Sequence, residues 1–392
     1  MKTRVPRNEL DNRMERFRAQ MDTTHPNWEI ATIFSKVNLY FFTGTIQDAM
    51  LLIPRDGEAC LWVKRSYERA MDESLFPQIR PMHSYRDAAQ SIPSVPDTVY
   101  IETEQVPLAL FSRLRKHFPF KYVRAIDKQI LQIRSVKSPY ELGLMERAGT
   151  IHRIVLEELV PDALTEGITE VEFTNELYRL MMEEGHHGIV RFGMSESEIM
   201  LGLIGFGESS IYPTYLDSPG GNAGLSPAVP LLGSRDRKLG NGDLVFVDIG
   251  CGFHGYHTDK TMTYVFGRSL PKEVVEIHRR CVKIQNTVAS HLKPGAVPSE
   301  IYESVMGELE PSFLENFMGY GDRRVYFLGH GIGLEIAEHP VIAKGFDQPL
   351  EEGMVISLNQ RKGSRELVWW EQRIPLSSHR MAAAVSPAIT LD

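Results

Sequence analysis

Residues 244–265 read LVFVDIGCGFHGYHTDKTMTYV, a pattern typical of a β-hairpin. The apolar run at residues 244–247 predicts a buried strand that leads into Asp248. After a glycine-containing turn, Asp259 precedes a second apolar run at residues 262–266. The stretch therefore places two carboxylates on two neighbouring strands.

The predicted turn lies between Gly252 and Gly255, so Asp248 and Asp259 are symmetric about it. In that register the two aspartates face each other, with Cβ atoms roughly 5 Å apart on one face of the hairpin. Carboxylates this close repel each other unless they share a proton or a cation. The hairpin alone leaves two interpretations open: a cation site, or a surface hairpin with ordinary solvated aspartates.

The composition is that of an ordinary globular protein, because 42% of the 392 residues are hydrophobic and 24% are charged. This length corresponds to about two or three domains. The formal net charge is -8, and no run of Lys or Arg forms the basic stripe that nucleic-acid binding requires. We therefore exclude nucleic acid as a main ligand.

Residues 1–20 are polar and lack the apolar core of a signal peptide, and no segment has the roughly 18 apolar residues of a membrane span. We therefore expect a cytoplasmic protein with no membrane partner. The three cysteines, Cys60, Cys251 and Cys281, are too few and too scattered for a disulfide framework or a thiolate zinc site. We expect them to be reduced thiols.

The first part of the chain alternates helical and strand-like runs, which predicts an α/β domain of about 130 residues. The turn at residues 55–58, with Gly57, connects two of the strands as a hairpin. No cluster of catalytic residues is recognisable there. The predicted helices are 8–22, 66–74 and 107–117, and the predicted strands are 29–34, 49–54, 59–63 and 98–102.

A second domain begins at Ser138, where Ser138 and Glu141 form a capping box with proline at the first helical position. Apolar residues at helical spacing then predict one long packed helix that extends to Leu159. Thr169 and Glu172 cap a further helix that ends near Gly185. The stretch 188–238 is rich in Gly, Pro and Ser and predicts loops and short strands around a pocket, with a solvated connection as the alternative.

After the hairpin, residues 271–292 and 298–309 predict two helices, and residues 350–358 predict a turn that leads into a strand. Between them, residues 327–334 read FLGHGIGL, so that His330 lies among glycines. Such a histidine has either a structural role or, since glycines permit close approach of the backbone, contact with a metal or substrate. The glycines alone do not indicate a dinucleotide site.

With these motifs the chain resembles the creatinase, prolidase and methionine aminopeptidase superfamily, the "pita-bread" metallohydrolases. NLYFFTG and LLIPRDGEACLWVKRSYERA resemble its N-terminal domain, and VDIGCGFHGYHTDKTMTYV and GHGIGLEIAEHP resemble two of its metal motifs. The resemblance implies an α+β protein: a creatinase-like α/β domain at residues 1–135, then a pita-bread catalytic domain at residues 136–392.

The resemblance also implies five metal ligands, namely two aspartates, one histidine and two glutamates. Asp248, Asp259 and His330 match the first three, with His330 also in the catalytic role. The family's site holds two divalent ions that share a water or hydroxide, which makes a nucleophile at neutral pH. Manganese, cobalt, iron and zinc all suit such ligands, and the sequence does not select one of them.

The chain departs from the family pattern after Leu358. Asn359 stands where the fourth ligand, a glutamate, is expected, and the strand of the fifth ligand is absent, so residues 358–392 are atypical. Restoring one base near codon 359 permits a reading that contains both glutamates, and we hypothesise a shifted reading frame, in the gene or in its sequencing. As written, the site lacks two negative charges, and we expect at most one weakly held metal. Glu366 and Glu371 do not have the spacing to replace them.

The family's peptidases also have helper histidines. This chain has Ala337 at one expected position and no histidine in residues 220–227, where the other is expected. His254 and His257 are candidate substitutes, with turn and surface histidines as the alternative. The same alternatives apply to the remaining candidates, His186, His187 and His339, of which His339 is the best placed to approach a pocket.

We therefore expect a metal-dependent hydrolase of the Xaa-Pro dipeptidase or aminopeptidase type, impaired in this chain, which acts on small peptides. One alternative is a non-peptidase branch of the fold, a creatinase-like hydrolase or a lyase for a small zwitterionic substrate. The other is a metal-poor binding protein without catalysis. A homodimer is common in the family and is expected here on that ground alone.

Overall fold

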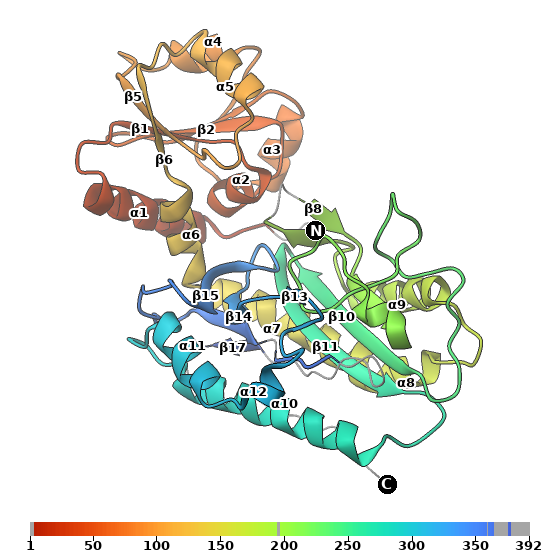
Figure 1. Ribbon diagram of the computed structural model, residues 1–392. Helices are drawn as coiled ribbons and strands as arrows, with labels where there is room; N and C mark the ends of the chain where they lie inside the picture. Colours follow the sequence, from red (N-terminus) through yellow and green to blue (C-terminus); the bar gives the residue numbers. More distant parts are fainter. Residues whose placement is uncertain (1–3, 194–196, 359, 364–374, 378–392) are drawn as a thin grey trace. The chain divides into compact units, whose positions relative to one another are not determined.

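The computed structural model describes residues 4–193, 197–358, 360–363 and 375–377. It divides the chain into two compact units, Met1–Arg134 and Ser135–Asp392, which Figure 1 shows coloured along the sequence. In the described part of the chain, no helix is long and apolar enough to cross a membrane.

The first unit contains a mixed sheet and helices around it. Its strands are β1 (Ile30–Ile33), β2 (Ala49–Pro54), β3 (Cys60–Val63), β4 (Ile79–Pro81), β5 (Thr98–Ile101) and β6 (Tyr122–Ala125). Its helices are α1 (Arg7–Thr24), α2 (Lys36–Thr43), α3 (Tyr67–Glu73), α4 (Tyr85–Ala89), α5 (Leu108–Arg115) and α6 (Asp127–Ser135). The described strands form a six-stranded sheet in the order β4-β3-β2-β1-β5-β6. The antiparallel pairing of β2 with β3 confirms the predicted hairpin, in which Gly57 has φ of 107°.

Glu102 is a buried carboxylate in this unit, at the end of β5. It accepts hydrogen bonds from the backbone N–H groups of Phe34 (2.6 Å) and Ser35 (3.0 Å) and from Asn38 Nδ2 (2.6 Å). Its burial raises the pKa of Glu102 to about 7, although these hydrogen bonds act in the opposite direction. The unit also has its own hydrophobic cluster, which includes Trp62 and Phe118.

The second unit contains two main sheets and several helices. Its helical elements are α7 (Pro139–Arg153), the π-helix η1 (Ile154–Leu159), α8 (Val160–Ala163), α9 (Glu170–Glu184), the 3₁₀-helix η3 (Gly207–Ile211), α10 (Lys272–His291), α11 (Pro298–Gly307) and α12 (Pro311–Leu314). Its earlier strands are β7 (Val190–Phe192), β8 (Ser197–Ile199), β9 (Gly202–Phe206), β10 (Leu244–Phe253) and β11 (Tyr256–Val265). Its later strands are β12 (Gly319–Tyr320), β13 (Arg323–Arg324), β14 (Phe327–Gly331), β15 (Glu338–Ala343), β16 (Val355–Leu358) and β17 (Pro375–Ser377).

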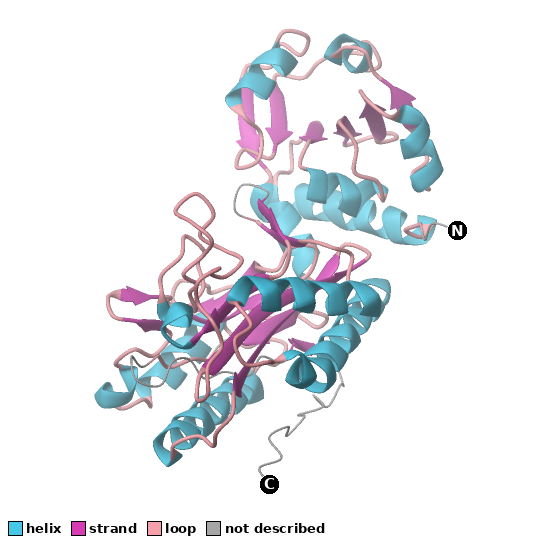
Figure 2. Cartoon of the chain, turned by 90° about the vertical axis from the view of Figure 1, so that its right-hand side faces the viewer, coloured by secondary structure: helices cyan, strands magenta, loops and turns pink. Residues whose placement is uncertain are grey.

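Two antiparallel sheets of this unit carry the predicted site residues. Among the described strands, one sheet has the order β11-β10-β9 and the other has the order β15-β14-β16-β17. Asp248 and Asp259 lie in the first sheet, and His330 lies on β14 of the second. Figure 2 shows the helices of this unit lying along its strands.

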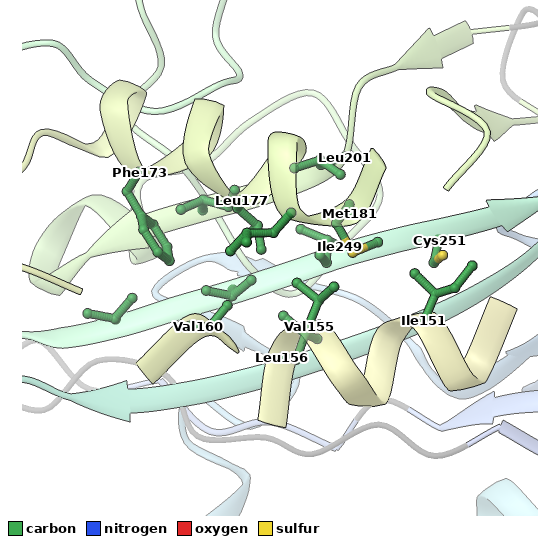
Figure 3. Packing of buried hydrophobic residues seen from close by; sticks show 14 of the residues in the cluster. Ile151, Val155, Leu156, Val160, Phe173, Leu177, Met181, Leu201, Ile249 and Cys251 are labelled. Carbon is green, nitrogen blue, oxygen red and sulfur yellow. The ribbon is translucent and has the colours of Figure 1, made fainter. Parts of the chain in front are cut away.

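The core of the second unit explains why the β10–β11 hairpin has a fixed position. Ile151 and Val155, from α7 and η1, and Leu177, from α9, pack with Ile249 and Cys251 of β10 in one buried cluster (Figure 3). Burying one aliphatic side chain of this size stabilises the folded state by about 1.5–3 kcal/mol relative to leaving it exposed. One face of the hairpin is thereby committed to the core.

The local signals in the sequence were reliable at helix starts. Both predicted capping boxes are present, Ser138 with Glu141 and Thr169 with Glu172, and α9 ends at Gly185 in the left-handed conformation. The predicted long helix does extend to Leu159, but it is not α-helical throughout, because α7 ends at Arg153 and the π-helix η1 continues it. Pro161, one turn later, has no N–H and its ring crowds the preceding turn, which accounts for the irregularity.

Candidate functional site

The register of the β10–β11 hairpin differs from the prediction. Phe253 pairs with Tyr256, so the turn consists of His254 and Gly255, which have φ of 46° and 92°. A two-residue turn with positive φ at both positions is of type I′, which suits the twist of the flanking strands. Asp248 is therefore opposite Thr261, and the predicted facing pair of aspartates is wrong.

The two aspartates nevertheless lie on the same face. Asp259 is opposite Gly250, two residues along the strand from Asp248. Side chains alternate with a period of two, so a shift of two residues keeps both carboxylates on one side of the sheet. Asp248 and Asp259 therefore form a diagonal cross-strand pair. Such pairs are roughly 7–8 Å apart, whereas directly opposite residues are roughly 5 Å apart.

His330 lies near Asp259, with 3.6 Å between His330 Nε2 and Asp259 Oδ2. Its other ring nitrogen, Nδ1, is 2.9 Å from the carbonyl oxygen of Gly331, and since a carbonyl only accepts, we assign the ring proton to Nδ1. Burial lowers the pKa of His330, which favours the neutral ring. The lone pair on Nε2 therefore faces a carboxylate, an arrangement that suits a shared cation.

Asp248 has a different environment, since both of its carboxylate oxygens have partners from protein side chains. Oδ1 accepts a hydrogen bond from the hydroxyl of Thr261 at 2.6 Å. Oδ2 is 3.0 Å from Nη2 of Arg361 and accepts a longer hydrogen bond, 3.4 Å, from the hydroxyl of Ser218. The positive charge beside Asp248 is thus a guanidinium.

Arg361 is completely buried. Its Nη2 also donates to the hydroxyl oxygen of Thr261 at 2.8 Å, and its guanidinium carbon is 5.0 Å from the ring centroid of Phe246. Burial lowers the pKa of Arg361 and the charge of Asp248 raises it, and a guanidinium stays protonated in such a setting. Sequence reasoning missed this residue, because it lies in the stretch that departs from the family pattern.

The side chains that the structure describes do not form a two-metal site. Within the described ranges, no group of three or more His, Cys, Asp and Glu side chains is arranged to hold a metal ion. Asp259 and His330 have suitable donor chemistry, but Asp248 is paired with an arginine. Asn359, Glu366 and Glu371 lie outside the described residues. The assignment of Asp248, Asp259 and His330 as ligands stays a prediction.

The candidate helper histidines fall into two groups. His254 is exposed in the hairpin turn and His339 is exposed on β15, so both are turn or surface residues. His257 is fully buried, and its ring accepts from the N–H of Arg191 (3.3 Å) and donates to the carbonyl of Gly333 (3.1 Å). Both ring nitrogens of His257 are therefore occupied, and the surface interpretation is wrong for this buried residue, while its role as a substitute helper stays a prediction.

His186 and His187 also accept hydrogen bonds from backbone N–H groups of the hairpin. The Nδ1 of His186 accepts from the N–H of Gly252 at 2.9 Å, and the Nδ1 of His187 accepts from the N–H of Gly255 at 3.1 Å. Burial is the main cause that lowers the pKa of His187 to about 2 and of His257 to about 3. These neutral rings fix the end of the hairpin, so the prediction of surface residues is wrong for the buried His186.

Comparisons with known proteins give the family. Residues 13–136 match the creatinase/prolidase N-terminal domain, and residues 143–366 match metallopeptidase family M24. An Xaa-Pro dipeptidase from Pyrococcus furiosus is 28% identical over 329 residues, which cover 83% of this chain and 84% of the relative.

Solved structures show the same fold. The prolidase from Pyrococcus horikoshii aligns with a TM-score of 0.74 at 23% identity and covers 93% of this chain and 95% of its own. An Xaa-Pro dipeptidase from Bacillus anthracis aligns with a TM-score of 0.75 at 18% identity, over 94% and 95% of the two chains. The predicted fold class, α+β with a creatinase-like domain before a pita-bread domain, is confirmed. The chain therefore belongs to metallopeptidase family M24, a family of hydrolases.

Proposed function

We propose that this chain is a hydrolase of the Xaa-Pro dipeptidase type, specific for small peptides, and that its activity is impaired as the sequence is written. The observation that carries the proposal is the Asp259–His330 pair, in which a carboxylate and an imidazole lone pair face each other at 3.6 Å. Relatives of similar length that are named Xaa-Pro dipeptidase support the substrate class.

The proposed impairment follows from charge. The bridging-hydroxide chemistry of the family needs two ions held by four carboxylates, and Asn359 offers a neutral carbonyl in place of one of them. Asp259 and His330 supply a single carboxylate and a neutral ring. We propose that they hold at most one divalent ion, weakly.

A second candidate function is a metal-poor binding protein of the same fold. The ion pair between Arg361 and Asp248 favours it, because a buried guanidinium already neutralises one of the predicted ligands. The two candidates differ in metal content and in catalysis, and both quantities are measurable.

The test measures bound Mn²⁺ per chain and then cleavage of a panel of Xaa-Pro dipeptides, creatine and sulfonium zwitterions. We expect less than one ion per chain and slow cleavage confined to the dipeptides. Asp259→Asn is expected to reduce this cleavage by on the order of 100-fold, since loss of even an indirect metal partner costs 10–100-fold. Asp243→Asn, which removes a carboxylate that pairs with Arg237, is the matched control and is expected to leave cleavage unchanged.

Three results would decide against parts of the proposal. Two tightly bound ions with rapid dipeptide cleavage would contradict the impairment. Turnover of creatine or a sulfonium compound in place of dipeptides would indicate the non-peptidase branch. No turnover at all, in protein that keeps its fold, would indicate the binding protein. Resequencing codon 359 separately tests the frame-shift hypothesis, which an intact frame encoding Asn359 would end.

A further inference from the structure

We infer that Arg361 is a built-in cation that replaces a metal ion at Asp248, so that this half of the site is neutralised by the protein itself. The inference rests on the proposed function only in taking Asp248 as a predicted metal ligand. Its evidence is the contact of Arg361 Nη2 with Asp248 Oδ2, at 3.0 Å between two buried groups.

Thr261 is hydrogen-bonded to both members of this ion pair. Its hydroxyl donates to Asp248 Oδ1 at 2.6 Å and accepts from Arg361 Nη2 at 2.8 Å. One oxygen of the carboxylate is therefore used by the hydroxyl and the other by the guanidinium. A metal ion at Asp248 would have to share these oxygens with the hydroxyl and the guanidinium.

The backbone on both sides of Arg361 keeps its side chain in the site. The carbonyl of Arg361 accepts from the N–H of Met318 at 2.8 Å. The Gln360 side chain donates to the carbonyl of Leu328 at 2.6 Å, and the N–H of Gly363 donates to the carbonyl of Asn316 at 2.9 Å. An arginine anchored on both sides is a fixed charge and cannot simply swing into solvent.

The space for the guanidinium also depends on a neighbouring glycine. A Cβ at Gly220 would lie 2.8 Å from Arg361 Nη1 and 2.7 Å from Cζ of Phe246, the ring beneath the guanidinium. Backbone therefore approaches the arginine closely from one side and an aromatic ring from another. This packing holds the guanidinium beside Asp248.

Repulsion between like charges completes the argument. A divalent cation close to Asp248 would lie within a few ångströms of a guanidinium that is shielded from water, where charges interact strongly. Within the described residues of this site, Asp259 and His330 are thus, on this inference, the groups left available to Mn²⁺. Removing the positive charge at residue 361 is expected to allow Asp248 to bind the metal ion.

The experiment measures Mn²⁺ affinity in the full chain by electron paramagnetic resonance, which reports the free ion. We expect Arg361→Met to bind Mn²⁺ at least about tenfold more tightly than the wild type. Asp248→Asn/Arg361→Met is expected to lose that gain. Arg237→Met, which removes another arginine paired with an aspartate in the same unit, is the matched control and is expected to bind as the wild type does.

Equal affinities in the wild type and Arg361→Met would overturn the inference, as would a gain that persists in the double variant. If Arg361→Met does not fold without metal, thermal unfolding decides. The double variant, in which no charge is left uncompensated, should then unfold at a higher temperature than Arg361→Met, and a double variant that is no more stable would contradict the pairing. These readouts need no peptidase activity, so a chain that gains Mn²⁺ affinity yet cleaves no dipeptide would support this inference and contradict the proposed function.

Discussion

At the scale of single residues, His257 makes a prediction about pH. Burial and the charge of Arg191 lower its pKa from 6.5 to about 3, so the native ring stays neutral while the unfolded ring takes up a proton below pH 6.5. The stability contributed by His257 is therefore complete above pH 6.5 and is lost as the pH falls toward about 3. Between about pH 7 and pH 5 the loss is about 2 kcal/mol, measurable by urea unfolding.

His257→Gln is the test variant, because an amide can still accept from the Arg191 N–H and donate to the Gly333 carbonyl. We expect this variant to lose less unfolding free energy than the wild type as the pH falls, because the contribution of His257 is removed. The contribution of His187 to the pH dependence remains. Glu102 acts in the opposite direction, since its raised pKa makes the native state bind more protons than the unfolded state between pH 4.5 and about 7. The contribution of Glu102 is the same in the variant and the wild type, so it cancels in their comparison. Identical pH profiles of unfolding free energy would contradict the role of His257.

At the scale of elements, the β10–β11 hairpin predicts a severe effect at Gly252. A Cβ there would lie 1.9 Å from His187 Nε2, the atom that is hydrogen-bonded to the carbonyl of Ile189 at 2.9 Å. Gly252→Ala must therefore displace the ring that also accepts from Gly255, and overpacking of this kind destabilises by about 1–3 kcal/mol. Urea unfolding of the purified variant measures the cost.

Gly143→Ala is the matched control for that substitution. Gly143 lies inside α7, and an added Cβ would meet no atom within 4 Å apart from its chain neighbours and the backbone of its own helix. Alanine in a helix interior is more favourable than glycine by about 0.5–1 kcal/mol, so this variant should be slightly more stable than the wild type. If both alanine variants were equally tolerated, the close packing at Gly252 would be refuted.

The elements also show which structural features a sequence can specify. Capping boxes at Ser138 and Thr169 were predictable because the signal and the structure lie within four residues of each other. The hairpin register was not, since glycines at 252 and 255 permit more than one turn, and His254 takes positive φ without a sequence signal for it. Strand β6 is exposed throughout, so it has no apolar alternation to reveal it.

At the scale of the whole molecule, the family pattern predicted three candidate site residues, of which the structure brings two into contact. Asp259 and His330 do come together, although they lie 71 positions apart in the sequence (330 minus 259) and on different sheets. The pairing of Asp248 with Arg361 was not predictable, because a buried ion pair depends on how two distant segments pack and not on local pattern. A rule that assigns metal ligands by motif alone misses a competing cation.

The division into two units predicts that a substitution that destabilises one unit leaves the other unit folded. Each unit has hydrophobic clusters of its own, so each can lose structure without the other. Asp248→Asn leaves the Arg361 guanidinium buried without its counter-charge, which costs about 3–5 kcal/mol. Glu102→Gln replaces the carboxyl group that accepts three hydrogen bonds in the first unit, at a cost of about 1–3 kcal/mol.

Hydrogen exchange read by mass spectrometry distinguishes the two effects, since peptides report each unit separately. Asp248→Asn should speed exchange in β10, β11 and β14 and leave β1, β2 and β5 at wild-type rates. Glu102→Gln should do the reverse, and the pair of variants forms a reciprocal control. Faster exchange across both units in either variant would show that the chain opens as one cooperative body. The Arg361–Asp248 pair would then stabilise the whole chain and not only the candidate site.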